Sequence, residues 1–165
     1  MDNKVAIPEI VQNAISSVDW EHWEQYGQCR SIPNEIWKIF KVHDDPSSAQ
    51  AVIDVEYATG NAEAGTYYPS VIATIPILSL IVQHGGDWAR CTALEILHDW
   101  IFMFSPEHKY REHIGTNERS DLKIVVRDEI SKIFPEFEKI AQRGDIMDNE
   151  ITFLRDLLEE FSEDR

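Results

Sequence analysis

The sequence predicts an all-α protein, built as a short right-handed solenoid of antiparallel helix pairs. Apolar residues recur at helical spacing along most of the chain, and proline or aspartate stands where each run begins. No segment shows the sustained alternation of apolar and polar residues that a half-buried strand requires. With 165 residues the chain is long enough for one core, so we expect a single domain over residues 1–165.

The N-terminal part predicts two short helices and then a helix pair. The short helices are expected between residues 8 and 26, where apolar positions are three and four residues apart. The first pair covers residues 33–57. Pro33 begins its first helix, and Asp45 caps its second helix, in which Pro46 occupies the first position.

The most apolar run of the chain, residues 67–82, begins the second pair. It is about sixteen residues long, which is shorter than the roughly 18–20 residues that a membrane-spanning helix needs. A strand is disfavoured because Pro76 would remove a ladder hydrogen bond at its centre. We expect a helix with Thr66 as its cap, Pro69 in its first turn and a kink at Pro76.

The second pair covers residues 68–104, and a third pair follows it. Asp87 is expected to cap the second helix of this pair, whose apolar residues nearly encircle its end. That helix should therefore be the central and most buried one. A polar connector over 107–117 leads to the third pair, residues 119–161, which Gly144 divides.

The charge of the chain limits its partners. Thirty acidic side chains against fifteen Lys and Arg give a net charge of −15, which argues against nucleic acid and against an anionic membrane as partners. No Lys or Arg occurs over residues 5–29 or 42–89, so much of the first half is acid-only. This half either keeps the protein soluble or meets a basic partner.

The two cysteines and the N-terminus bear on the cellular location. Cys29 and Cys91 fit neither a zinc pattern nor a disulfide framework, so reduced thiols are expected. No basic segment followed by an apolar run opens the chain, so we expect no secretion signal and a cytoplasmic location.

A series of short motifs carries a family resemblance over roughly residues 18–100. The motifs are Val18-Asp19-Trp20, Tyr26-Gly27, Ile32-Pro33, Asp45-Pro46, Gly65-Thr66-Tyr67-Tyr68-Pro69 and Ile75-Pro76-Ile77-Leu78. In order and spacing they resemble a family of small bacterial HEAT-like repeat proteins, and the helix pairs have the forty-residue period of HEAT repeats. The chain departs from the family at Glu63-Ala64, where His-Gln is common. Some members are similar to immunity proteins of polymorphic toxin systems.

No motif in the sequence predicts catalysis. A nucleophile elbow and a phosphate-binding loop are both missing from the sequence. Glu95 and His98 have the Glu-x-x-His spacing of di-metal helical bundles, but such a site needs a second pair of this kind, which the chain lacks. We therefore expect no enzyme activity, no metal and no cofactor.

The resemblance implies a cytoplasmic immunity protein, which binds a cognate toxin domain and blocks its active site or substrate surface. A nuclease with a basic surface fits the acidic charge best. The alternative is a HEAT-like adaptor or scaffold in a complex unrelated to toxins. The expected acidic contacts are Asp44, Asp45, Asp54, Glu56, Glu63 and Asp87, and the expected aromatic anchors are Trp23, Tyr67 and Tyr68, although Trp23 also suits the core.

Overall fold

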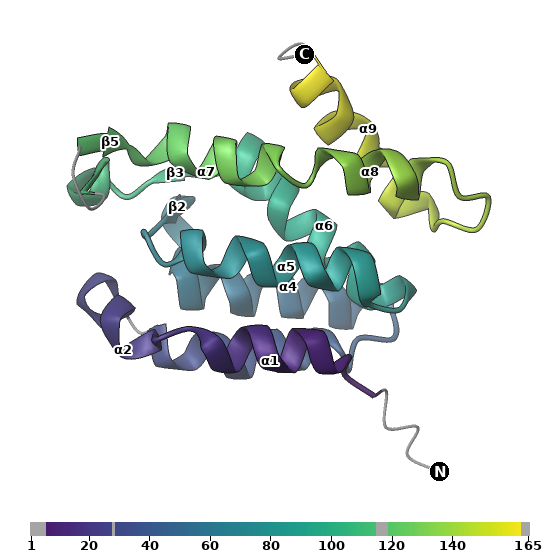
Figure 1. Ribbon diagram of the computed structural model, residues 1–165, viewed down its shortest axis with the longest axis horizontal. Helices are drawn as coiled ribbons and strands as arrows, with labels where there is room; N and C mark the ends of the chain where they lie inside the picture. The colour runs from purple at the N-terminus through teal and green to yellow at the C-terminus, as the bar shows by residue number, and fades with distance from the viewer. Residues whose placement is uncertain (1–5, 28, 115–118, 163–165) are drawn as a thin grey trace.

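The structure is a computed structural model that describes residues 6–27, 29–114 and 119–162, and it is mostly helical (Figure 1). The expectation of a helical protein is confirmed in this coarse form. The helices are α1 (Glu9–Ser17), α2 (Trp20–Trp23), α3 (Ile32–Ile39), α4 (Asp45–Thr59), α5 (Val71–His84), α6 (Asp87–Phe102), α7 (Leu122–Ser131), α8 (Phe134–Ala141) and α9 (Asp148–Ser162).

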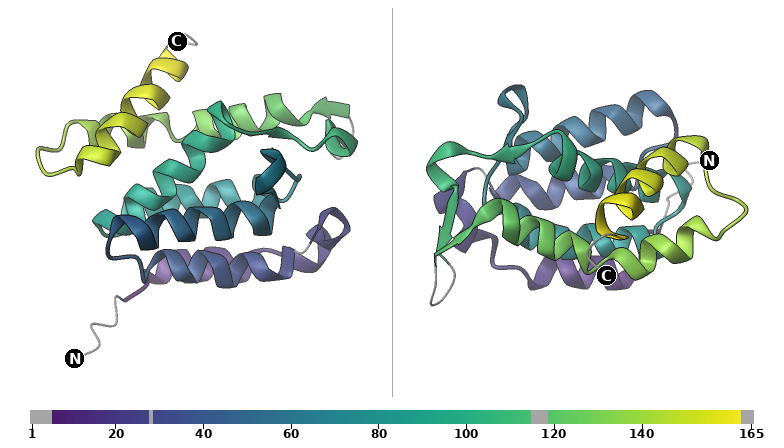
Figure 2. Two further views of the ribbon diagram at one scale, coloured as in Figure 1. Left: turned by 180° about the vertical axis from the view of Figure 1, so that it is seen from behind. Right: turned by 90° about the horizontal axis from the view of Figure 1, so that it is seen from above.

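The helices are stacked in layers (Figure 1), and α6 packs against helices of more than one layer. In Figure 1, α1 lies below α5, while α7 and α8 lie above it, and the contacts of α5 with α1 and α7 agree with this view. Seen from behind, α4 and α9 lie on the other side of the molecule, and both pack against α6 (Figure 2). Helix α3 packs on α4, and α8 packs on α9.

Helix α6 forms the centre of the core. Leu94, Leu97 and Trp100 are almost completely buried, and more residues are buried in α6 than in any other helix of the described chain. Burial of each large apolar side chain contributes about 1.5–3 kcal/mol to stability. The position of α6 between α4, α5 and α9 explains why its apolar residues are not confined to one face.

Two small sheets, which the all-α expectation did not include, accompany the helices. The first sheet has the order β1-β2-β3, with β1 antiparallel and β3 parallel to β2; the second is the antiparallel pair β4-β5. Each strand has two or three residues, too few to show alternation in the sequence. The strands are β1 (Gly60–Asn61), β2 (Thr66–Tyr67), β3 (Ser105–Pro106), β4 (Glu112–Ile114) and β5 (Arg119–Asp121).

Hydrogen bonds outside the ladder extend the first sheet. The Ser105 N–H donates to the Gly65 carbonyl at 3.0 Å, and the Glu107 N–H donates to the Tyr67 carbonyl at 2.9 Å. At Gly60 a Cβ atom would lie 2.1 Å from the Thr66 carbonyl oxygen, so only glycine fits where β1 passes β2. This sheet fixes the segment before α5 to the segment after α6.

The N-cap residues of α4 and α6 each lie one residue before the expected cap. Asp44, not Asp45, is the N-cap of α4, because its carboxylate accepts from the Ser47 N–H at 2.9 Å while the Ser47 hydroxyl accepts from the Asp44 N–H. Gly86 is the N-cap of α6, so Asp87 is the first helical residue. In both places two residues of suitable type stand side by side, and the sequence does not distinguish them.

Helix α5 begins later than expected. It starts at Val71, and Ser70 is its N-cap residue. The expected cap, Thr66, is paired in β2 instead, and Pro69 lies before the helix. Pro76 stands inside the helix as expected, where it offers no N–H to the preceding turn.

Helix α7 also begins later than the expected residue 119. Residues 119–121 pair in β5, and the helix begins at Leu122, with the Asp121 carboxylate accepting from the Lys123 N–H at 2.8 Å. The expected connector over 107–117 contains a 3-10 turn and β4; residues 115–117 lie outside the described part. In the described chain no helix has the length and hydropathy of a membrane span.

Candidate functional site

Two of the expected acidic contacts belong to local hydrogen-bonded pairs beside α4. Lys38 Nζ of α3 lies 3.2 Å from Asp54 Oδ2, and the Tyr57 hydroxyl donates to Glu63 Oε1 at 3.1 Å. Both acids keep exposed surface, so a partner can still reach them. A pocket of about 270 Å³ next to them is lined by Ser31, Glu35, Lys38, Asp54, Tyr57 and Ala58.

Three further expected contacts lie at helix N-termini. Asp44 caps α4, and Asp45, which is exposed, accepts from the Asn149 side-chain amide of α9 at 2.9 Å. Asp87 accepts from Arg90 within α6 at 3.0 Å. Capping and pairing account for all three carboxylates, although each stays partly or fully exposed.

The expected aromatic anchors include one that cannot serve. Tyr67 is only 1% exposed, so the expectation that it contacts a partner is wrong for this conformation. Tyr68 and Trp23 are half-buried within a group of rings. In that group Tyr110 packs edge-on against Tyr68 and Tyr26, with ring centroids 5.6 and 5.3 Å apart. Their exposed edges are what remains for a partner.

Ionisable side chains from three helices meet along α6. We call Glu56 of α4, Glu95 and Asp99 of α6, and Asp156 of α9, the three-helix acidic cluster. His98 connects its members, with Nδ1 at 3.2 Å from Asp99 Oδ1 and Nε2 at 3.3 Å from Asp156 Oδ2. Because α6 packs against both α4 and α9, carboxyl groups far apart in the sequence converge here.

Among the expected acidic contacts, Glu56 is the one whose burial differs most from the expectation. It was expected as an exposed contact, but it is only 6% exposed, and its Oε1 atom has no hydrogen-bonding partner among the described residues. Burial raises the pKa of Glu56 to about 8, with further contributions from Asp99 and Glu95. The side chain therefore holds a proton at neutral pH, and a buried acceptor is left unused at the cluster.

The pKa values of Glu95 and His98 are also shifted. Burial raises the pKa of Glu95, and the nearby Asp99 carboxylate raises it further. Burial lowers the pKa of His98, but Asp99 and Asp156 outweigh burial, so this pKa is raised overall. The raised pKa favours the charged form of His98 between these carboxyl groups.

A pocket adjoins the cluster at the C-terminal end of α6. Its volume is about 310 Å³, and it shares Asp156 with the cluster. Arg155 lies beside Asp156 with Nε at 3.2 Å, on the exposed side of α9. The lining residues are Phe102, Asp156, Glu159 and Glu160, so the surface next to the cluster is also acidic.

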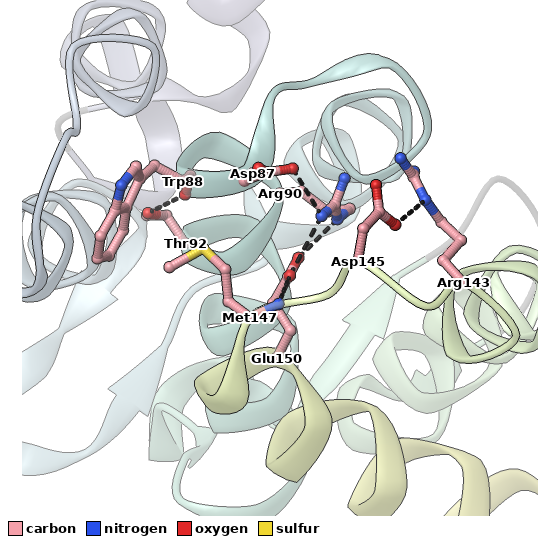
Figure 3. A network of polar contacts seen from close by, with 8 residues as sticks. All are labelled: Asp87, Trp88, Arg90, Thr92, Arg143, Asp145, Met147 and Glu150. Carbon is pink, nitrogen blue, oxygen red and sulfur yellow. Dashed lines mark hydrogen bonds and ion pairs between the residues drawn. The ribbon is translucent and has the colours of Figure 1, made fainter.

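A buried ion pair holds α9 against α6 (Figure 3). Arg90 donates from Nε to Glu150 Oε1 at 2.6 Å and from Nη2 to Oε2 at 3.1 Å, with side chains 2% and 0% exposed. Glu150 also accepts from the Met147 N–H at 2.8 Å, and Asp87 accepts from Arg90. This bidentate pair fixes where α9 begins, and thereby places its later residues beside α6.

The two cysteine thiols lie in the core. Cys29 and Cys91 are buried, and burial raises the pKa of Cys91 to about 12, so this thiol stays protonated at neutral pH. Within residues 6–27, 29–114 and 119–162, no three His, Cys, Asp or Glu side chains are arranged to hold a metal ion.

Sequence reasoning missed Asp99 and Asp156 and considered Glu95 and His98 only as metal ligands. One signal was present: Glu95 and Asp99 are four residues apart on a helix that was expected to be buried. Like charges at this spacing destabilise a helix, so they suggest a use elsewhere. Asp156 carries no such signal, because its place depends on how α9 packs.

Comparisons of the chain with models of known protein families, with curated proteins and with solved structures found no match. The resemblance to HEAT-like proteins therefore remains an expectation from the short motifs. Function has to be inferred from the arrangement of side chains.

Proposed function

We propose that this protein is a cytoplasmic immunity protein that binds and neutralises a cognate toxin domain with a basic surface. One observation carries the proposal: four carboxyl groups from three helices converge at the three-helix acidic cluster, where His98 lies between Asp99 and Asp156. The acidic pocket beside it extends this surface along α9. The half-buried members of the cluster, Glu95, Asp99 and Asp156, would attract cationic side chains of another protein.

The proposed architecture is a short solenoid in which α4, α6 and α9 form one row and α1, α5 and α7 form the other. The contacts within each row support it. In a solenoid of helix pairs, one row forms an extended surface that partners use. The three-helix acidic cluster would then lie on the row that faces the toxin.

The proposed mechanism is occlusion. A nuclease must hold phosphate groups with Lys and Arg, so an acidic protein can occupy the place of its nucleic-acid substrate. The net charge of −15 would accelerate the encounter at low ionic strength. Rapid association suits an inhibitor that must act before the toxin does damage.

The test is a growth assay with the protein encoded by the neighbouring gene. That protein should arrest growth when produced alone, and co-production of this chain should restore growth. Reversing two charges at the pocket, with Asp156→Lys and Glu159→Lys, should weaken binding at least tenfold and reduce protection.

A matched control makes the same change of charge elsewhere. Asp128 and Glu138 are exposed acids of α7 and α8, so Asp128→Lys with Glu138→Lys should leave protection intact. Equal loss of protection in both variants would contradict a contact at the cluster. A neighbour that binds but is harmless alone would contradict the immunity function and favour an adaptor.

A further inference from the structure

The buried end of the three-helix acidic cluster has an acceptor that the described protein does not use. Glu56 Oε1 is enclosed and has no hydrogen-bonding partner among the described residues. Leaving a buried polar atom unpaired costs about 1–3 kcal/mol. Asp99 and Glu95 lie close enough to affect its ionisation. A donor supplied from outside would satisfy Glu56 Oε1 and could also contact the two neighbouring carboxyl groups.

We propose that the three-helix acidic cluster binds one guanidinium group, the side chain of an arginine on the partner, between Glu56, Glu95 and Asp99. This deepens the proposed function and rests on it in taking the partner to be a basic protein. Glu95 and Asp99 are half-buried, so the guanidinium would enter between them from the surface. It would meet Glu56 at the buried end.

The chemistry of the cluster favours a guanidinium over other cations. A guanidinium presents five N–H donors in one plane, which suits a site with several carboxyl oxygens, of which Asp99 Oδ1 already contacts His98 Nδ1. It is less strongly hydrated than an ammonium group, so it loses less on entering a half-buried site. A metal ion is disfavoured, because no three acids of the described chain are arranged as ligands.

The neighbours of Glu56 determine how binding depends on pH. From α6 it faces Asp99 and Glu95, and His98 lies one hydrogen bond beyond Asp99. From α9, Asp156 contacts His98 and Arg155 rather than Glu56. On α3, which also packs on α4, Lys38 is paired with Glu35 and Asp54 rather than with Glu56. A guanidinium would thus be the first full cation to reach Glu56, and the carboxyl would release its proton.

The test uses acetyl-Gly-Arg-Gly-amide as the probe, so that a single guanidinium is offered. Amide shifts of the ¹⁵N-labelled protein should change first in α4 and α6, with millimolar affinity. The affinity should rise roughly eightfold from pH 7 to pH 8.5, because Glu56, with a pKa of about 8, ionises over this range. Exposed carboxylates are ionised throughout this range and would produce no such rise.

Two kinds of control separate the site from general attraction. Glu56→Gln keeps the shape but cannot ionise, so it should weaken binding at least tenfold at pH 8.5 and lose most of the pH dependence. Glu138→Gln makes the same change at an exposed position of α8 and should bind as the wild type does. The citrulline peptide, which has no charge, should not bind.

Equal affinities for the Glu56→Gln and Glu138→Gln variants would overturn the proposal, and so would a lysine peptide that binds as tightly as the arginine peptide. The outcome is independent of the growth assay. A protein that protects but does not bind the arginine probe keeps its immunity function and loses this site. A protein that binds the probe through Glu56 but has no toxic neighbour keeps the site and loses the immunity function.

Discussion

At the scale of single residues, Glu56 shows how a carboxyl group can be kept in the interior of a helical protein. Burial and two neighbouring carboxyl groups all favour its protonated form, so the protein holds a neutral side chain there at pH 7. The cost is an acceptor without a donor. A residue that is costly in the free protein can become favourable when a cation arrives.

The pH dependence of stability should reveal this residue. The unfolded chain releases the Glu56 proton near pH 4.5, whereas the folded protein holds it until about pH 8. Between these values the folded state binds more protons, so the free energy of unfolding should fall as the pH rises, by on the order of 2–4 kcal/mol in total. Urea denaturation at pH 5, 6.5 and 8 measures it.

Glu56→Gln should remove most of this fall and be more stable than the wild type at pH 8. His98 acts in the same direction above pH 6.5, because its raised pKa means that its ion pairs are lost as the pH passes that value. The part of the curve between pH 5 and 6.5 therefore belongs to Glu56 and Glu95. A Gln variant that falls as steeply as the wild type would disprove the assignment.

The residue scale is also where prediction from sequence was weakest. Glu56 and Tyr67 were expected at the surface, but one faces α6 and the other lies in β2, in the core. Polarity and position in a helical pattern give the face that a residue occupies, but not what covers that face. Asp54 lies on another face of α4 and Glu63 lies between β1 and β2. Both keep exposed surface, and their contact with a partner stays a prediction.

At the scale of elements, the start of α4 offers a test of its cap. Asp44→Ala should cost about 1 kcal/mol, because the Ser47 N–H would lose the Asp44 carboxylate as its acceptor. Asp45→Ala, one residue on, is the matched control and should change stability by no more than about 0.5 kcal/mol, since its bond to Asn149 is exposed. Thermal unfolding of the two variants distinguishes them; a larger loss for Asp45→Ala would contradict the assigned cap.

The buried pair between α6 and α9 offers a second test. Arg90→Met should destabilise the protein by about 3–5 kcal/mol, because it leaves Glu150 charged and buried. The double variant Arg90→Met with Glu150→Leu should recover much of the loss, since no uncompensated charge remains. Denaturant midpoints at one pH measure all three proteins. If the double variant is no more stable than Arg90→Met, the pair is not what joins these helices.

Helices were predictable from the sequence because each carries its own signals. Pro33, Pro46 and the apolar spacing placed α3 and α4 within three residues of their observed ends. The strands were not predictable, because two-residue strands have no pattern, and β3 belongs to a segment that looked like a helix end. The buried pair links residues sixty positions apart, and no local signal relates them.

At the scale of the whole molecule, the net charge of −15 should make stability depend on salt. Repulsion among carboxylates opposes the compact state, and added salt screens it. Raising NaCl from 20 to 300 mM should increase the melting temperature by several degrees. The variant Asp128→Asn with Glu138→Gln, which lowers the charge without touching the cluster, should show a smaller increase. A melting temperature that falls with salt would contradict this.

The packing of the whole molecule explains why the candidate site was only partly predictable from the sequence. An acidic contact surface was expected from composition, and it was sought in the first half of the chain, where long stretches contain no Lys or Arg. The cluster instead draws Glu56 from that half and Asp156 from the last helix, because α4 and α9 both pack against α6. Packing partners are a property of the assembled helices, and periodicity within each helix does not reveal them.

The pairing of β2 with β3 has a consequence for the way in which the chain assembles. Residues 66–67 pair with residues 105–106, so the segment that contains α5 and α6 begins and ends at the same sheet. This segment therefore forms a closed loop. During synthesis on a ribosome, this loop can close only after Pro106 has emerged. Helices α7 to α9 would then pack against α5 and α6 that are already folded. Pulse-labelled hydrogen exchange during refolding should show protected amides in α5 and α6 before those in α9.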